Sequence, residues 1–230
     1  MNLLLNTPAL DVYEHMALDE TMVKLRPNEG TLRFFRWAPG PAATYGYAQF
    51  YGEVGRALPA PFFENAARRP TGGGIVLHTD DLTFSLIFQY PGRPAEIYQK
   101  LHRCILEMLS RQGQTLSLSG VAPKEAYRPS HAHQASACFQ NPVENDLLTA
   151  NGEKILGGAL RRFGTTVLYQ GSLQLPCART DPHCKKAVID GVRSFLAADF
   201  TPRSITPEVL QKARELAQAC YRTKEWREKF

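Results

Sequence analysis

A run of glycines beside two arginines is the feature of this chain best suited to binding a ligand. The run reads Arg68-Arg69-Pro70-Thr71-Gly72-Gly73-Gly74. Glycines let a ligand approach the backbone closely, and two guanidinium groups can face an anion. The run is neither a P-loop nor a dinucleotide-binding fingerprint, because it lacks Gly-Lys-Ser/Thr and leads into a predicted strand. A plain glycine-rich turn is the alternative that these residues leave open.

A second stretch places a lysine directly after a predicted turn. Asn151-Gly152 is typical of a β-hairpin turn, and Lys154 follows it at the start of an apolar, glycine-rich strand. A half-buried ammonium group could stabilise negative charge on a carbonyl or phosphoryl oxygen in a transition state. The alternative is a solvated lysine beside a turn.

The cysteines could act as nucleophiles, metal ligands or core residues. They number five, an odd count without the spacing of a disulfide framework, so we expect reduced thiols. Two groups mix cysteine with histidine but lack the paired spacing of a structural zinc site, and we expect no metal at either. These groups are His131, His133 and Cys138, and Cys177, His183 and Cys184.

Hydrophobic periodicity predicts the elements that must position these residues. Helices are expected over residues 8–26 and 93–112, and after the cap signal Thr206-Pro207-Glu208. Strand pairs are expected over 31–37 with 43–49, 75–78 with 82–89, and 154–161 with 165–175. The pattern predicts an α+β fold with antiparallel strands and a few long helices.

Two connecting segments are predicted from their composition. Residues 124–141 are rich in Ala, Ser, His and Pro and show no periodicity, so we expect a loop over a site. Asp80-Asp81 lies between two predicted strands and is expected to be a solvated turn.

Composition bounds the class of protein. A chain of 230 residues with 43% apolar residues can bury one sizeable core, so we expect a single domain over 1–230. Its C-terminal part, about 183–230, is expected to be helical and to form no separate accessory domain. The net charge of +5 favours acidic partners such as nucleotides or an acidic carrier protein. We expect no nucleic-acid partner, no membrane association and a cytoplasmic location, since there is no basic stacking surface, spanning segment or signal peptide.

Several spaced motifs, taken in order, resemble those of lipoate-protein ligases and related octanoyltransferases. The resemblance covers roughly residues 16–175. The motifs are Ala17-Leu18-Asp19-Glu20, Arg36-Trp37, Tyr45-Gly46-Tyr47-Ala48-Gln49, Arg68-Arg69-Pro70-Thr71-Gly72-Gly73-Gly74, Asn145-Asp146, Gly152-Glu153-Lys154-Ile155-Leu156-Gly157-Gly158-Ala159 and Gln170-Gly171-Ser172.

The resemblance implies a biotin/lipoate ligase-like catalytic domain, with a mixed, largely antiparallel sheet flanked by helices. Lys154 would contact the acyl carbonyl and the activated phosphate, Arg69 and the glycines would hold an acyl-nucleotide, and His78 would close the site. The implied acyl- and nucleotide-binding residues are Trp37, Arg69, Thr71, Gly72, Gly73, Gly74, His78, Asn145, Asp146, Gly157, Gly158, Ala159 and Gln170.

The motifs point to two subclasses of this family. Asn145-Asp146 looks like the ligase version of its motif and favours use of ATP with Mg²⁺. Ser136-Ala137-Cys138-Phe139 resembles the segment that supplies the nucleophile of cysteine-type octanoyltransferases, where Lys154 could stabilise the Cys138 thiolate. A small buried apolar residue is the alternative for Cys138. Tyr169-Gln170-Gly171-Ser172 departs from the His-Gly of many ligases.

The favoured hypothesis is a lipoate-protein ligase that converts lipoate and ATP to lipoyl-AMP and transfers the lipoyl group to a carrier lysine. The implied partners are a lipoyl carrier domain of a 2-oxoacid dehydrogenase subunit, glycine cleavage H protein or similar, and an accessory subunit. The first alternative is an ATP-independent octanoyltransferase that uses a Cys138 thioester and an acyl-carrier protein. The second is a non-catalytic lipoate-binding module.

Overall fold

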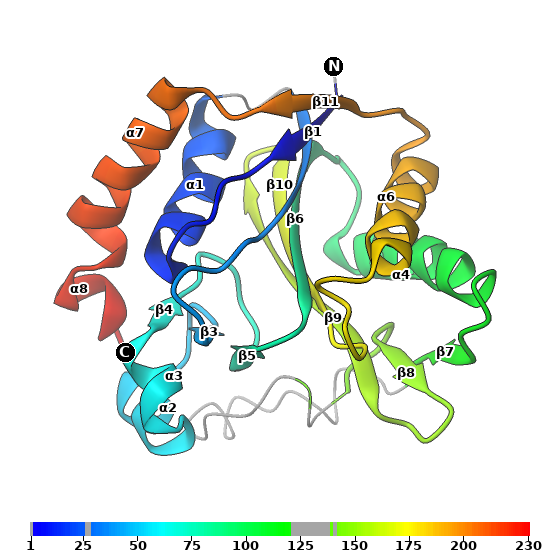
Figure 1. Cartoon of the computed structure of the whole chain (residues 1–230), viewed down its shortest axis with the longest axis horizontal. Helices are drawn as coiled ribbons and strands as arrows, with labels where there is room; N and C mark the ends of the chain where they lie inside the picture. The colour runs from blue at the N-terminus through cyan, green and yellow to red at the C-terminus, as the bar shows by residue number, and fades with distance from the viewer. Residues whose placement is uncertain (1, 26–28, 121–138, 140–141) are drawn as a thin grey trace.

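Two sheets organise the chain, as Figure 1 shows. The computed structural model describes residues 2–25, 29–120, 139 and 142–230. The larger sheet has eight strands in the order β11-β1-β2-β6-β10-β9-β8-β7, and the smaller has three in the order β4-β3-β5. The large sheet is parallel where β1 pairs with β2 and β11, and antiparallel from β2 to β7. The expected mixed, largely antiparallel sheet is therefore confirmed.

The strands of the large sheet are β1 (Asn2–Asn6), β2 (Gly30–Phe34), β6 (Leu82–Gln89), β7 (Leu116–Leu118), β8 (Leu147–Thr149), β9 (Lys154–Phe163), β10 (Thr166–Leu173) and β11 (Thr201–Ser204). Those of the small sheet are β3 (Ala42–Tyr45), β4 (Ala66–Arg68) and β5 (Val76–His78). The helices are α1 (Val12–Leu25), α2 (Tyr51–Ala57), α3 (Ala60–Glu64), α4 (Pro94–Ser110), α6 (Pro182–Leu196), α7 (Pro207–Leu216), the π-helix η2 (Ala217–Tyr221) and α8 (Lys224–Arg227).

Helices cover both faces of the large sheet. In Figure 1, α1 and α7 lie on one side of its central strands, and α4 and α6 lie on the other. Successive residues of a strand point to opposite faces, so Leu86 and Phe88 of β6 join the core under α4 and α6, whereas Ile87 joins the core under α1. The central strands are thus buried on both faces. Within the described residues, no helix is long and apolar enough to cross a membrane.

Local sequence signals predicted one hairpin and two helices well. The hairpin of β9 and β10 pairs from Thr166 with Phe163 through Leu173 with Leu156, as expected. The predicted helix over 93–112 is α4, which has proline in its first turn. The side chain of Thr206 accepts a hydrogen bond from the backbone N–H of Val209 and so caps α7.

The other two predicted strand pairs are wrong. β2 pairs with β1 and β6, and β3 pairs with β4 and β5 in the small sheet. The chain therefore changes sheet at residues 35–41 and again at 79–81, where the sequence suggested simple turns. A turn signal fixes only that the chain reverses, because it carries no information about the strand that will lie alongside. The expected C-terminal helical segment also contains a strand, β11, which pairs with β1.

Candidate functional site

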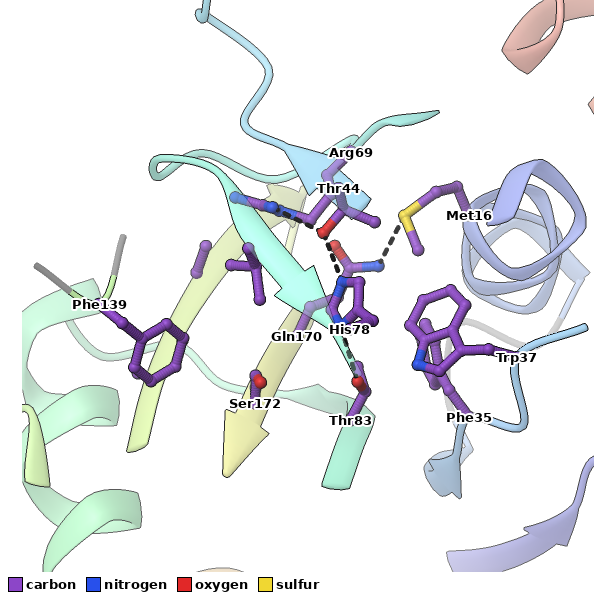
Figure 2. Close-up of a pocket in the computed structure, with 15 residues that line it drawn as sticks. Met16, Phe35, Trp37, Thr44, Arg69, His78, Thr83, Phe139, Gln170 and Ser172 are labelled. Atoms are coloured by element: carbon purple, nitrogen blue, oxygen red, sulfur yellow. Dashed lines mark hydrogen bonds between the residues drawn. The ribbon is translucent and has the colours of Figure 1, made fainter. Parts of the chain in front are cut away.

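A pocket between the two sheets brings seven of the predicted site residues together (Figure 2). We call it the inter-sheet pocket. The small sheet and the loop that leads to it form one wall, β9 and β10 form the opposite wall, and Met16 of α1 contributes from the side. Its lining residues are Met16, Phe35, Trp37, Thr44, Arg69, Val76, His78, Thr83, Phe139, Gly157, Gly158, Ala159, Gln170, Gly171 and Ser172.

The pocket is apolar at both ends. Figure 2 places Phe139 on one side and Trp37 with Phe35 on the opposite side. His15 stacks on Phe35 at 4.5 Å between ring centroids, which fixes that ring from behind. Between the ends lie glycines and small polar side chains, so the pocket can take an extended apolar chain with a polar group along it.

Arg69 shapes the segment between β4 and β5, residues 69–75, which we call the glycine loop. Its guanidinium donates to the carbonyl oxygens of Gly72 and Gly74 and to Oγ1 of Thr44, all at 2.8 Å. Gly73 has a left-handed φ of 89°, a conformation that favours glycine. A Cβ added at Gly46 would lie 1.9 Å from the carbonyl oxygen of Gly73. The loop therefore depends on the close approach of the backbones at Gly46 and Gly73, and on the hydrogen bonds that the Arg69 side chain donates within the loop.

Arg68 is also used internally. It is fully buried and donates to the carbonyl oxygens of Gln49, Trp226 and Arg227, each at 2.8 Å. The sequence suggested that both guanidinium groups face an anion, and in this structure both instead bind backbone carbonyls. Arg69 still lines the inter-sheet pocket, whereas Arg68, at the end of β4 directly before the glycine loop, binds the C-terminal helix α8.

Lys154 is buried and forms an ion pair. Its Nζ lies 2.8 Å from Oδ2 of Asp146, and the two side chains are 3% and 4% exposed. A Cβ added at Gly157, which lines the pocket, would meet Nζ at 2.7 Å, so the ammonium group lies directly over that glycine. The alternative of a solvated lysine is therefore excluded. Nζ also lies 5.2 Å from the centroid of the Phe139 ring, within range of a cation–π interaction.

Asp146 is held by its backbone neighbours as well as by Lys154. Its Oδ2 accepts a hydrogen bond from the backbone N–H of Val143 at 2.8 Å. Burial raises the pKa of Asp146 above its ordinary value, although the charge and hydrogen bond of Lys154 act in the opposite direction. Because the pair is desolvated, losing either partner would leave the other charge buried and unpaired.

His102 supports the turn that carries Asp146, and sequence reasoning missed it. Its Nδ1 lies 2.7 Å from the carbonyl oxygen of Asn145, and its Nε2 lies 2.6 Å from the hydroxyl of Tyr169. A neutral ring with a proton on Nδ1 donates to Asn145 and accepts from Tyr169. Burial lowers the pKa of His102 to about 4. The only available signal was a histidine on the apolar face of α4, between Leu101 and Ile105.

Asp81 corrects the expectation of a solvated turn. It is 2% exposed, and its Oδ2 lies 2.9 Å from Nδ1 of His78. The same oxygen accepts from the hydroxyls of Thr83 and Ser172, both at 2.6 Å. Burial alone would raise the pKa of Asp81, but the charge of His78 and these three hydrogen bonds lower it to about 2. Asp81 therefore stays ionised and orients His78, on which Trp37 stacks at 4.3 Å between ring centroids.

The predicted residues differ in where they lie relative to the pocket. Those that line the inter-sheet pocket are Trp37, Arg69, His78, Gly157, Gly158, Ala159 and Gln170. Those that contact a lining residue or support one are Thr71, Gly72, Gly73, Gly74, Asp146 and Lys154. Asn145 instead contacts His102, which does not line the pocket. Cys138 lies outside the described residues, as do most of the predicted loop 124–141 and the two histidines at which no metal was expected, His131 and His133.

Pocket residues that sequence reasoning missed are mainly small or apolar, such as Phe35, Thr44 and Val76. Their types carry no chemical signal, and only the approach of the two sheets makes them neighbours. Within the described part of the chain, no three His, Cys, Asp or Glu side chains are grouped closely enough to hold a metal ion.

Comparison with known proteins identifies the family. Residues 11–193 match the lipoyl protein ligase A/B catalytic domain. A relative named octanoyltransferase LipM from Kyrpidia tusciae is 33% identical over 207 residues, which cover 84% of this chain and 73% of the relative. Another of the same name, from Brevibacillus brevis, is 26% identical over 266 residues, which cover 96% of each chain.

Solved structures support the same fold. Protein Ta0514 of T. acidophilum, solved with bound lipoic acid, superposes with a TM-score of 0.77 at 21% identity, covering 100% of this chain and 98% of its own. At that identity the likeness concerns the fold alone. Together with the family match over most of the chain, these findings show that the chain is an enzyme of the lipoyl protein ligase A/B catalytic domain family.

Proposed function

We propose that this protein is an octanoyltransferase, which moves an octanoyl group from an acyl-carrier protein to a lysine of a lipoyl carrier domain without ATP. The observation that carries the proposal is the 33% identity, over 84% of this chain, with a relative named octanoyltransferase LipM. This reverses the preference that the sequence motifs alone gave to the ligase.

The position of Phe139 supports Cys138 as the nucleophile. Cys138 itself lies outside the described residues, but its chain neighbour Phe139 lines the inter-sheet pocket and packs beside the ammonium group of Lys154. A cation near a thiol favours the thiolate, which is the reactive form. By contrast, burial raises the pKa of three other thiols, those of Cys104, Cys184 and Cys220.

In the first proposed step, the Cys138 thiolate attacks the carbonyl carbon of the octanoyl thioester on the acyl-carrier protein. The new carbon–sulfur bond forms, the bond to the carrier sulfur breaks, and the departing thiolate takes a proton from solvent. Negative charge develops on the carbonyl oxygen during this attack. The Lys154 ammonium, held over Gly157 by Asp146, would stabilise that charge, a role worth about 10²–10³ in rate for one donor.

In the second step, the neutral amine of the carrier lysine attacks the acyl-Cys138 thioester. An amide bond forms, the Cys138 thiolate leaves, and the proton released by the amine goes to solvent or to that thiolate. Lys154 would again stabilise the oxyanion. The apolar ends of the inter-sheet pocket, Trp37 with Phe35 and Phe139, would hold the octanoyl chain throughout.

The arginines near the glycine loop bear on the use of ATP. Arg68 and Arg69 bind backbone carbonyls, and Asp146 pairs with Lys154. Of these, Arg69 and Asp146 are residues that the resemblance assigned to acyl- and nucleotide-binding, and in this arrangement they bind other groups of the protein. The proposed reaction therefore contains no step through ATP or Mg²⁺.

A lipoate-protein ligase is the second candidate, favoured by the Asn145-Asp146 motif. One experiment separates the two. An apo lipoyl domain is incubated with the protein and octanoyl-acyl carrier protein without ATP, or with lipoate, ATP and Mg²⁺, and its intact mass is measured. Modification in the first mixture, together with an octanoylated enzyme that Cys138→Ala cannot form, is the expected result. Modification only in the second mixture would overturn the proposal in favour of the ligase, and none in either would favour a binding module or a missing accessory subunit.

A further inference from the structure

A chain of buried hydrogen bonds joins the glycine loop to the core of the molecule. The hydroxyl of Thr71, in the loop, donates to Oε1 of Gln170 at 2.6 Å. Nε2 of Gln170 in turn donates to Oδ2 of Asp19 at 2.7 Å. Thr71 and Asp19 are fully buried, and Gln170 is 6% exposed. Gln170 thus bridges β10 to the loop on one side and to α1 on the other.

The series of hydrogen bonds ends in the core at Asp19, which is held in a rigid ion pair. Oδ1 of Asp19 accepts from Nε of Arg33 at 2.7 Å and from the hydroxyl of Ser85 at 2.6 Å. Arg33 is fully buried and also donates from Nη2 to the carbonyl oxygen of His15 at 2.7 Å. A buried ion pair whose remaining hydrogen-bonding groups are satisfied is a fixed point in the core.

The chemistry of the partners fixes the orientation of the Gln170 amide. An ionised carboxylate only accepts hydrogen bonds, so the amide must present its NH₂ group to Asp19. Its carbonyl oxygen then faces Thr71 and can only accept, which makes the Thr71 hydroxyl the donor. Position 170 therefore requires one donor toward α1 and one acceptor toward the loop.

At its other end, the same series of hydrogen bonds reaches the wall of the inter-sheet pocket. Gln170 itself lines the pocket, and Nε2 also lies 3.6 Å from the sulfur of Met16, another lining residue. The backbone carbonyl of Thr71 accepts from the N–H of Tyr47 at 2.8 Å, and a Cβ added at Gly73 would lie 3.7 Å from Cβ of Ala159. A shift of Thr71 would therefore move the loop against the β9 wall.

We propose that Gln170 is a positioning residue. It holds Thr71 and the glycine loop in place beside the inter-sheet pocket by tethering them to the buried Asp19–Arg33 pair. The inference rests on the proposed function for the identity of the acyl chain. Gln170 acts on the binding of the acyl donor through the loop, while Lys154 acts on the reacting carbonyl. Losing the tether should therefore raise KM far more than it lowers kcat.

Substitutions at Gln170 separate this role from simple packing. Gln170→Leu keeps the volume and removes both hydrogen bonds, so we expect KM for the octanoyl donor to rise by about tenfold. Gln170→His retains one acceptor and one donor when the ring is neutral and should keep most of the affinity. Thr71→Val removes the other partner, and the double variant Gln170→Leu/Thr71→Val should be no worse than either single variant.

Gln170→Glu carries a distinctive signature in its pH profile. It places a second carboxylate against Asp19, and the repulsion between the two charges raises the pH at which one of them takes up a proton. Below that pH the pair shares one proton, which restores a donor toward Asp19 and an acceptor toward Thr71. The affinity of this variant relative to the wild type should therefore increase as the pH falls through the proton uptake of the pair.

Ser85→Ala is the matched control, because it removes a hydrogen bond to the same Asp19 carboxylate without touching the loop. The test measures octanoate binding by calorimetry, alongside KM and kcat with octanoyl-acyl carrier protein. Weaker binding in Gln170→Leu with near-normal binding in Ser85→Ala supports the inference. Unchanged octanoate affinity in a folded Gln170→Leu protein, or an equal loss in Ser85→Ala, would overturn it. Octanoate binding requires no turnover, so a failure of the proposed transferase activity would be seen separately as transfer that is absent from the wild type.

Discussion

Two cationic regions lie close to the inter-sheet pocket, and they use their charge differently. Arg68 and Arg69 donate to several backbone carbonyls of the glycine loop and its neighbours, whereas Lys154 contacts one carboxylate and lies over a pocket glycine. A guanidinium has five donors in a rigid fork and suits the first task, and a compact ammonium suits the second. Positive charge beside a glycine-rich loop therefore identifies a site without showing which cation serves the ligand.

The largest effect should come from removing the Lys154 ammonium. Lys154→Ala is expected to lower kcat for acyl transfer by about 10²–10³, because the developing oxyanion loses its cation. Transfer rates by intact mass and the melting temperature should be measured together. Lys154→Arg serves as control, since it keeps the charge but changes its position. A Lys154→Ala protein with normal kcat would remove Lys154 from the mechanism and erase the contrast with the arginines.

Removing Arg68 should damage the fold instead of the chemistry. Arg68→Ala removes the donor of the Trp226 carbonyl and one of the two donors of the Arg227 carbonyl, which keeps the hydroxyl of Tyr45. It also removes a fully buried side chain, and the free energy of unfolding is expected to drop by about 3 kcal/mol. Urea denaturation measures the drop. Single-turnover acyl transfer by the fraction that stays folded should keep a near-normal rate. A stable variant with a much lower rate would instead show that Arg68 serves the substrate.

His102 makes the stability of the Lys154 region depend on pH. Its pKa of about 4 lies below the ordinary value of 6.5, because burial disfavours the charged ring. Between these two values the unfolded state binds a proton that the folded state does not, so stability falls as pH drops from 6.5 toward 4 and is unaffected above 6.5. The full contribution is at most about 3 kcal/mol.

Denaturation of the wild type and of His102→Gln across pH 4.5–7 would measure this contribution. Burial also lowers the pKa of His15, which adds a slope of the same sign, so the quantity to compare is the difference between the two proteins. We expect a smaller slope in His102→Gln, and the exposed His183→Gln variant should behave like the wild type. Equal slopes in all three proteins would mean that the His102 ring titrates normally.

The smallest effect should come from an exposed cation. Lys186 pairs with Asp190 one turn later on α6, and its side chain is 69% exposed. Lys186→Ala should change the free energy of unfolding by less than about 0.5 kcal/mol, because water and salt screen such pairs. Thermal denaturation is sufficient to check this. A loss of unfolding free energy as large as that of Arg68→Ala would show that burial does not determine how much a cation contributes to stability.

Local patterns in the sequence predicted the elements whose partners are close in the chain. The hairpin of β9 and β10 and the helix α4 follow from periodicity and turn residues within one segment. The partners of β3 and β5 could not be predicted in this way, because the small sheet pairs segments that the turn signals assigned to other strands. Strand pairing over long separations depends on the whole core, which no short window contains.

The site shows the same division. Motif order led to the glycine loop, to Lys154 and to Asp146, because a family resemblance preserves residue types at spaced positions. Burial decided the rest: Asp81 looked like a solvated turn, yet it accepts three hydrogen bonds inside the protein. Only the meeting of the two sheets shows that a carboxylate at that point is enclosed.

The hydrogen bonds from Arg68 to the carbonyls of Trp226 and Arg227 affect how the protein should respond to proteolysis. The two carbonyls lie 158 and 159 residues after Arg68 in the sequence, although they bind the residue that precedes the glycine loop. A protease such as trypsin that cut after Arg222 would release them and leave every pocket-lining residue intact. Clipping in that short C-terminal stretch would thus destabilise a preparation whose active-site peptides are all still present.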